Sequence, residues 1–126
     1  MTAPFAIRGI DHVVLRARDP AALIAFYQTV LGCPVERTAG HLVQLRAGGS
    51  LIDIVPQTDA SGAAANMDHL CLTLDPFDVD AVAAWLMDNS VSVGEIATRY
   101  GAGGNGRSVY LTDPEGNGLE LRAATT

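Results

Sequence analysis

The chain contains an internal repeat, and this repeat constrains its fold more than any other feature. The segment DHVVLRARDP at residues 11–20 is matched by DHLCLTLDP at residues 68–76. Each segment opens with Asp-His, alternates apolar and other residues, and reaches Asp-Pro before a helical pattern, so His12 and His69 occupy equivalent positions. The repeat predicts two modules, about residues 8–57 and 67–123, within a single domain of residues 1–126.

Each module is predicted to contain a strand, a helix and three further strands. In the first module, Asp19 caps a helix that begins at Pro20 and follows a strand at residues 10–17. In the second module a helix is predicted over about residues 77–88, and the turn sequence DPEGNG at residues 113–118 separates the last two strands. The predicted fold class is α+β, with the two βαβββ modules pairing their sheets into a curved, partly open barrel that has its helices outside.

Further expectations concern the second module and the segment before it. The helical spacing places Met87 on the inward face of the predicted helix, and Trp85 is expected to lie in the core. The glycine-rich stretch RYGAGGNGR at residues 99–107 is expected to form a mobile loop over a site. The small, polar segment QTDASGAAAN at residues 57–66 is the predicted linker between the modules.

The alternation of side chains along the predicted strands places four polar residues opposite the residues that pack under the helices. In HLCLTL the three leucines form one apolar face, which leaves His69 on the other. The same alternation leaves His12, Asp53 and Glu120 on the corresponding faces of their strands. Two imidazoles and two carboxylates on one concave surface form a candidate site for a divalent metal ion. A carboxylate among leucines is also costly to bury unless a charged group meets it.

Each of these residues has a simpler interpretation as well. A single histidine at the start of a strand is more often a hydrogen-bonded structural residue than a metal ligand. Glu120 alone could be a carboxylate at a strand edge that faces solvent. The metal interpretation therefore depends on four residues at equivalent points of a repeat.

Charge and composition exclude several classes of function. The formal net charge is −6 without any basic run, so neither nucleic acid nor an anionic membrane is expected as a partner. All eight basic residues are arginine, which excludes a Schiff-base lysine and a P-loop lysine. No apolar run approaches the roughly 20 residues of a membrane-spanning helix, and the N-terminus lacks a signal-peptide pattern. Cys33 and Cys71 do not suggest a disulfide scaffold, so the reducing cytoplasm is the expected location.

The chain resembles the vicinal oxygen chelate superfamily, which includes glyoxalase I, fosfomycin-resistance thiol transferases, extradiol dioxygenases and bleomycin-resistance proteins. The segments that carry the resemblance are DHVVLRARDPAALIAFYQTVLG, SLIDIV, MDHLCLTL and SVYLTDPEGNGLEL. Together they span nearly the whole chain, and the wider pattern is most similar to small glyoxalase-domain proteins. The resemblance implies a pair of βαβββ modules with a metal ion in the concave sheet.

The resemblance also implies a set of metal ligands. By position, His12, His69 and Glu120 match the three usual ligands of the superfamily. Asp53 matches the place of a fourth ligand, a glutamate in glyoxalase I, and is shorter than glutamate by a methylene. Three roles are open for Asp53: it binds the metal through water, it acts as a base, or it does not participate. One divalent ion per site is implied, and Ni, Zn, Mn, Co and Fe(II) are all open.

Other positions match substrate-binding residues of particular subfamilies. Arg16 matches an arginine that holds a glutathione carboxylate in glyoxalase I, although a surface arginine is the simpler interpretation. Ser108 and Tyr110 match positions that hold phosphonate in fosfomycin transferases, but the absence of lysine argues against fosfomycin itself; Tyr110 could instead be a partly buried core residue. Cys71 falls on the same strand face as His69 and is interpreted as lining the substrate pocket.

The leading hypothesis is a divalent-metal-dependent enzyme of glyoxalase type, a lyase or isomerase similar to lactoylglutathione lyase. The shared chemistry of the superfamily implies a small, oxygen-rich substrate whose two adjacent oxygens chelate the metal in an enediolate-like intermediate. Glu120 or Asp53 would be the catalytic base, and Arg16 would hold an anionic part of the substrate, such as that of a thiol conjugate. A homodimer with two equivalent sites is expected, because small relatives are commonly dimers.

Two alternatives belong to other functional classes. A two-histidine, one-carboxylate set with Fe(II) is sufficient for a ring-opening dioxygenase. The third hypothesis is a metal-free protein that binds an aromatic or antibiotic ligand, as in bleomycin resistance. In that case Glu120 would pair with an arginine, such as Arg122 or Arg107, instead of a metal ion.

Overall fold

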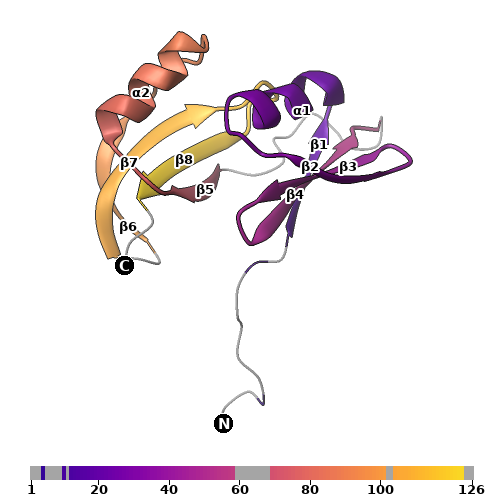
Figure 1. Cartoon of the computed structure of the whole chain (residues 1–126), viewed down its shortest axis with the longest axis horizontal. Helices are drawn as coiled ribbons and strands as arrows, with labels where there is room; N and C mark the ends of the chain where they lie inside the picture. The colour runs from indigo at the N-terminus through magenta and orange to yellow at the C-terminus, as the bar shows by residue number, and fades with distance from the viewer. Residues whose placement is uncertain (1–3, 5–9, 11, 59–68, 102–103, 124–126) are drawn as a thin grey trace. The chain divides into compact units, whose positions relative to one another are not determined.

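The computed structural model describes residues 4, 10, 12–58, 69–101 and 104–123 of the chain. The chain divides into two compact units, Met1–Thr58 and Asp59–Thr126, and each unit is described by itself. In Figure 1 the first unit runs from indigo to magenta, and most of the second from orange to yellow. The predicted linker falls mainly on residues 59–66, which lie outside the described residues. The pairing of the two sheets into a barrel and the single domain remain predictions.

The first unit is a four-stranded mixed sheet with one helix. Its strands lie in the order β1-β4-β3-β2; β1 and β4 are parallel and the other pairs are antiparallel. The helix begins as predicted, because Pro20 stands in its first turn and the Asp19 side chain accepts a hydrogen bond from the backbone N–H of Ala22 at 3.1 Å. The elements are β1 (His12–Ala17), α1 (Pro20–Thr29), β2 (Val35–Ala39), β3 (Leu42–Ala47) and β4 (Ser50–Pro56).

The core of the first unit lies between α1 and one face of its sheet. The helix contributes Leu23, Phe26 and Tyr27, all of which are buried. The rings of Phe26 and Tyr27 meet edge to face, with their centroids 5.3 Å apart. Every second residue of β1 and β4 packs against them, including Leu15 and Ile54. The alternate residues of these strands, among them the candidate metal ligands, therefore project from the opposite face.

The second unit repeats this arrangement. Its strands lie in the order β5-β8-β7-β6, again with one parallel pair, β5 with β8. The predicted α+β class and the two βαβββ modules are thereby confirmed. Neither α1 nor α2, the helices of the described residues, is long and apolar enough to cross a membrane. The elements are β5 (His69–Leu74), α2 (Val79–Asp88), β6 (Ile96–Gly101), β7 (Gly104–Thr112) and β8 (Gly118–Ala123).

Strand register confirms the equivalence of the two modules. In the parallel pair β1–β4, His12 lies beside Leu51, two residues before Asp53. In the parallel pair β5–β8, His69 lies beside Gly118, two residues before Glu120. Each histidine is thus a diagonal neighbour of one carboxylate on the adjacent strand.

Three predictions for the second unit are wrong. Trp85 and Met87 do not lie in its core, since their exposed fractions are 52% and 67%. One face of a short helix reaches the sheet, and Leu86 occupies it, so the side chains on either side of Leu86 turn outward. The stretch at residues 99–107 is not a long loop either, because its described residues extend β6 and β7, which pair as far as Gly101 and Gly104.

Candidate functional site

Polar side chains cover the face of the second sheet that is turned away from the core. His69 begins β5, Glu120 lies in the middle of β8, and Ser108 and Tyr110 lie on β7. The register between β7 and β8 places Tyr110 beside Glu120 and Ser108 beside Arg122, so these four side chains share one face. The leucines that alternate with them along β8 are buried in the core, as the sequence predicts.

The carboxylate of Glu120 is the centre of this polar face. Its side chain is buried, and Ser108 Oγ donates a hydrogen bond to Glu120 Oε2 at 2.7 Å. The other carboxylate oxygen, Oε1, lies 3.5 Å from Nε2 of His69. Because β8 lies between β5 and β7, Glu120 connects side chains from both neighbouring strands. One oxygen is fixed by a hydroxyl group, and the other faces an imidazole nitrogen.

The geometry of His69 and Glu120 fits two ligands of one metal ion. Two donors bound at about 2.0–2.2 Å, with bond angles near 90–110°, lie roughly 3.0–3.4 Å apart. The observed 3.5 Å between His69 Nε2 and Glu120 Oε1 is close to that range. Among the residues the structure describes, no three His, Cys, Asp or Glu side chains are grouped closely enough to hold a metal ion. Of the four predicted ligands, these two are brought into contact within the second unit.

Tyr110 stands beside this pair. Its ring meets that of His69 edge to face, with centroids 6.3 Å apart, and the guanidinium carbon of Arg99 lies 5.8 Å from the Tyr110 centroid. Burial raises the pKa of the Tyr110 phenol, the Glu120 carboxylate raises this pKa further, and Arg99 opposes both effects. The phenol is therefore protonated at neutral pH and can donate a hydrogen bond.

Cys71 and Arg122 complete the polar face. Cys71 lies beside Glu120 in the register of β5 and β8, and both cysteines of the chain are free thiols. Burial raises the pKa of the Cys71 thiol, Glu120 raises it further, and Arg122 partly opposes this, so the thiol is protonated at neutral pH. Arg122 is only 4% exposed, a burial that the sequence does not predict. Its guanidinium passes over Gly106, where a Cβ atom would lie 2.9 Å from Arg122 Nη2.

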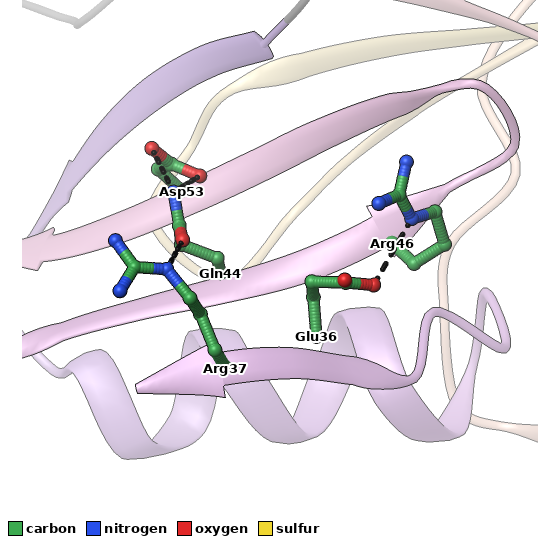
Figure 2. Close-up of polar contacts among 5 residues, drawn as sticks. All are labelled: Glu36, Arg37, Gln44, Arg46 and Asp53. Carbon is green, nitrogen blue, oxygen red and sulfur yellow. Dashed lines mark hydrogen bonds and ion pairs between the residues drawn. The ribbon is translucent and has the colours of Figure 1, made fainter. Parts of the chain in front are cut away.

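In the first unit, a chain of hydrogen bonds from two side chains, Arg37 and Gln44, holds Asp53 (Figure 2). Neither side chain was predicted from the sequence. Asp53 is 4% exposed, and its Oδ1 and Oδ2 both accept hydrogen bonds from Nε2 of Gln44, each at 3.1 Å. Nε of Arg37 in turn donates to Oε1 of Gln44. The available signal was the alternation in HLVQLR, which places Gln44 opposite the buried Leu45 and therefore on the Asp53 face.

His12 and Arg16 lie on β1, and both side chains are exposed. Val14 lies between them in sequence and beside Asp53 in the register, so the three β1 residues share the face of Asp53. The structure thus places each site residue whose strand face alternation predicts on that face. His12, Arg16 and Asp53 belong to the first unit; His69, Cys71, Ser108, Tyr110 and Glu120 belong to the second.

Comparison with known proteins identifies a family whose model the chain matches and individual proteins to which it is similar. Residues 9–121 match the family described as the Glyoxalase/Bleomycin resistance protein/Dioxygenase superfamily. Metallothiol transferase FosB of Staphylococcus saprophyticus is 26% identical over 121 residues, which cover 94% of this chain and 79% of that protein. Virulence protein STM3117 of Salmonella typhimurium is 30% identical over 122 residues, which cover 91% of this chain and 83% of that protein.

Solved structures share the same fold. The crystal structure of STM3117 matches with a TM-score of 0.81 and 26% identity, covering 94% of this chain and 98% of that chain. The crystal structure of lactoylglutathione lyase from Agrobacterium tumefaciens matches with a TM-score of 0.73 and 25% identity, covering 94% of this chain and 95% of that chain.

Proposed function

The chain belongs to the glyoxalase/bleomycin resistance protein/dioxygenase superfamily, and from this membership we propose that it is a divalent-metal-dependent enzyme with glyoxalase-type lyase or isomerase chemistry. The observation that carries the proposal is the buried carboxylate of Glu120. Ser108 fixes one of its oxygens, and the other faces His69 at a separation suited to a shared metal ion. Similarity to a lactoylglutathione lyase supports the same reaction class.

In this proposal the ion is held by His12, His69 and Glu120. The two histidines begin equivalent strands of the repeat, and Glu120 supplies the negative charge that a divalent cation requires. A divalent cation bound by these residues would act as a Lewis acid on two neighbouring oxygens of a small substrate.

The other polar residues act on the substrate. Tyr110, whose phenol is protonated at neutral pH as in an ordinary tyrosine, donates a hydrogen bond to a substrate oxygen. Glu120 or Asp53 accepts the proton that leaves the carbon next to the carbonyl group. Arg16, which is exposed on the same strand face as His12, pairs with a carboxylate of a thiol conjugate such as a glutathione adduct. Cys71 lines the face as a neutral thiol.

A homodimer with two equivalent sites is part of the proposal. Light scattering of the full chain at micromolar concentration tests it directly. The expected result is twice the mass of one chain, and the mass of a single chain contradicts this part.

A second candidate is a metal-dependent thiol transferase, which the similarity to metallothiol transferase FosB favours. The same ligand set serves both reactions, and the difference lies in the second substrate. A transferase forms a carbon–sulfur bond to an electrophile such as an epoxide, whose ring C–O bond breaks and whose oxygen takes up a proton, whereas the lyase or isomerase rearranges the adduct of a thiol and an α-ketoaldehyde. Product analysis by mass spectrometry and NMR therefore separates the two.

Activity of the reloaded protein tests the proposal. Metal-free protein is reloaded separately with Ni, Zn, Mn, Co or Fe(II) and assayed with methylglyoxal and glutathione for thioester formation. Glu120→Gln should lower kcat about 100-fold or more, whereas Glu36→Gln, which alters an exposed carboxylate paired with Arg46, should have wild-type kcat. Equal activity of Glu120→Gln and wild type, or no activity with any of the five metals, contradicts the proposed chemistry.

A further inference from the structure

The two equivalent carboxylates of the repeat are held in different ways. Glu120 lies on β8 and Asp53 on β4, and each of these strands is flanked by a histidine strand on one side and an antiparallel strand on the other. Both carboxylates are buried. A difference in their hydrogen bonds therefore reflects different side-chain neighbours and not a different place in the sheet.

The Glu120 carboxylate contacts side chains of both strands that neighbour β8. Oε2 accepts a hydrogen bond from Ser108 on β7, and Oε1 is directed at His69 on β5, 3.5 Å away. The carboxylate therefore keeps one oxygen available toward the histidine strand.

Within the described residues, the Asp53 carboxylate accepts hydrogen bonds from one neighbouring strand, β3. Both of its oxygens accept hydrogen bonds from the single amide nitrogen of Gln44, which lies directly beside Asp53 on β3. His12 lies on β1, which borders β4 on the other side. Both oxygens of the Asp53 carboxylate are thus engaged by a side chain of β3, as Figure 2 shows.

Arg37 fixes the orientation of Gln44. Without Arg37, the Gln44 amide group could rotate by about 180° and direct its oxygen at Asp53. That orientation is unfavourable, because two hydrogen-bond acceptors, the amide oxygen and the carboxylate, would then face each other. Because Arg37 Nε donates to Oε1 of Gln44, the amide nitrogen is directed at Asp53. The neighbouring ion pair between Glu36 and Arg46 lies on the same two strands and does not contact Asp53.

From this asymmetry we propose that Gln44, oriented by Arg37, is a positioning residue that keeps Asp53 out of the metal ligand set. The inference rests on the proposed metal site and assigns its ligands more closely: Glu120 binds the ion, while Asp53 remains a carboxylate outside the coordination sphere. Without the amide, Asp53 would rotate toward β1 and join His12 as an additional ligand. Gln44 would then determine how many coordination positions are left for substrate.

Metal titration of the full chain tests this inference. Metal-free wild-type protein and variants are titrated with Zn and with Co(II), with dissociation constants from chelator competition and the Co(II) absorption spectrum as a report on ligand number. Asp53→Asn should change Kd less than about threefold, whereas Gln44→Leu should tighten binding roughly tenfold and alter the Co(II) spectrum. Adding Asp53→Asn to Gln44→Leu should abolish both effects. Arg37→Ala should tighten binding less, and the matched control Arg46→Ala should bind as wild type.

The outcomes separate this inference from the proposed function. A wild-type protein that binds no metal, or that binds it equally well after His69→Ala, overturns both. A metal site that is lost in His69→Ala but weakened about tenfold or more by Asp53→Asn alone shows that Asp53 is already a ligand and overturns only the inference. A folded Gln44→Leu protein with unchanged Kd also overturns it. If Gln44→Leu does not fold, Asp53→Asn and Arg37→Ala, the latter altering an exposed side chain, decide the question by the same criteria.

Discussion

Nε2 of His69 lies 3.5 Å from Oε1 of Glu120, across the parallel strands β5 and β8. Ser108 holds the opposite oxygen of the same carboxylate, so a buried acidic group is fixed in place and directed at an imidazole. The same diagonal relation between histidine and carboxylate positions occurs in the first unit, where Gln44 holds Asp53. The repeat thus carries one carboxylate with an oxygen near its histidine and one whose two oxygens both accept hydrogen bonds from Gln44.

Removing the Ser108 hydroxyl should destabilise the fold and weaken metal binding. Ser108→Ala leaves a buried carboxylate oxygen without its 2.7 Å donor, and such a loss costs about 1–3 kcal/mol. Denaturant unfolding measures this cost, with Ser92→Ala, at an exposed position, as the control. A loss for Ser108→Ala no larger than for Ser92→Ala contradicts the role assigned to the hydroxyl.

Tyr110 should ionise at higher pH than an ordinary tyrosine. The difference between ultraviolet titrations of metal-free wild type and Tyr110→Phe isolates this phenol, and its pKa should exceed about 10. Glu120→Gln should lower this pKa, and Arg99→Ala should raise it, because the carboxylate favours the neutral phenol and the guanidinium favours the phenolate.

The raised pKa of Tyr110 also has a consequence for stability. A folded-state pKa above the unfolded value contributes stability that is fully present below about pH 10 and is lost as pH rises through the folded pKa. The wild type should therefore lose more stability than Tyr110→Phe between neutral and strongly alkaline pH. Identical pH dependence for the two proteins contradicts the raised pKa.

Gly94 should not tolerate a side chain. A Cβ atom there would lie 2.8 Å from the backbone carbonyl oxygen of Tyr110, which also accepts a hydrogen bond from Gly94 N–H at 2.7 Å. Because backbone cannot move aside as a flexible side chain does, Gly94→Ala should cost about 1–3 kcal/mol. Gly49 is the matched control, since a Cβ atom at Gly49 meets nothing within 4 Å. Equal unfolding free energies for the two alanine variants contradict the close approach.

Asp113 should be needed for the turn that leads into β8. Its Oδ1 accepts hydrogen bonds from the backbone N–H groups of Glu115 and Asn117, at 2.9 and 3.0 Å, and its Oδ2 accepts from Nδ2 of Asn117 at 2.9 Å. Asp113→Ala removes both acceptor oxygens, and with them three hydrogen bonds, from a buried turn and should cost about 3 kcal/mol or more. Asp113→Asn retains the Oδ1 acceptor and should cost less. A smaller loss for Asp113→Ala than for Asp113→Asn is inconsistent with this role.

Much of the fold could be predicted from the repeat and from alternation. The equivalence of His12 and His69 follows from the repeated Asp-His and Asp-Pro sequences, and the registers of β1–β4 and β5–β8 confirm it. Strict alternation along β8 places Glu120 opposite leucines, because successive side chains of a strand point to opposite faces. Helix α1 begins where its capping residues predict.

Tertiary packing determines the features that were not predicted from the sequence, or were predicted wrongly. Trp85 is apolar enough for a core, but the contact between α2 and the sheet is narrow and Leu86 fills it. The glycines between Arg99 and Arg107 suggested a loop, yet Gly101, Gly104 and Gly106 continue the ladder of β6 and β7. The hydrogen bonds between Gln44 and Asp53 depend on the register of β3 against β4, which no local pattern specifies.

Metal content of purified and reloaded protein is the most direct test of the central claim. Elemental analysis compares wild type with His12→Ala, His69→Ala and Glu120→Gln, and with His41→Ala as a matched histidine outside the predicted ligand set. The predicted result is about one divalent ion per chain in wild type and His41→Ala, and a large loss of metal in the other three variants. A wild-type protein without metal after reloading, or equal metal in wild type and His69→Ala, would contradict a metal site built on His69 and Glu120.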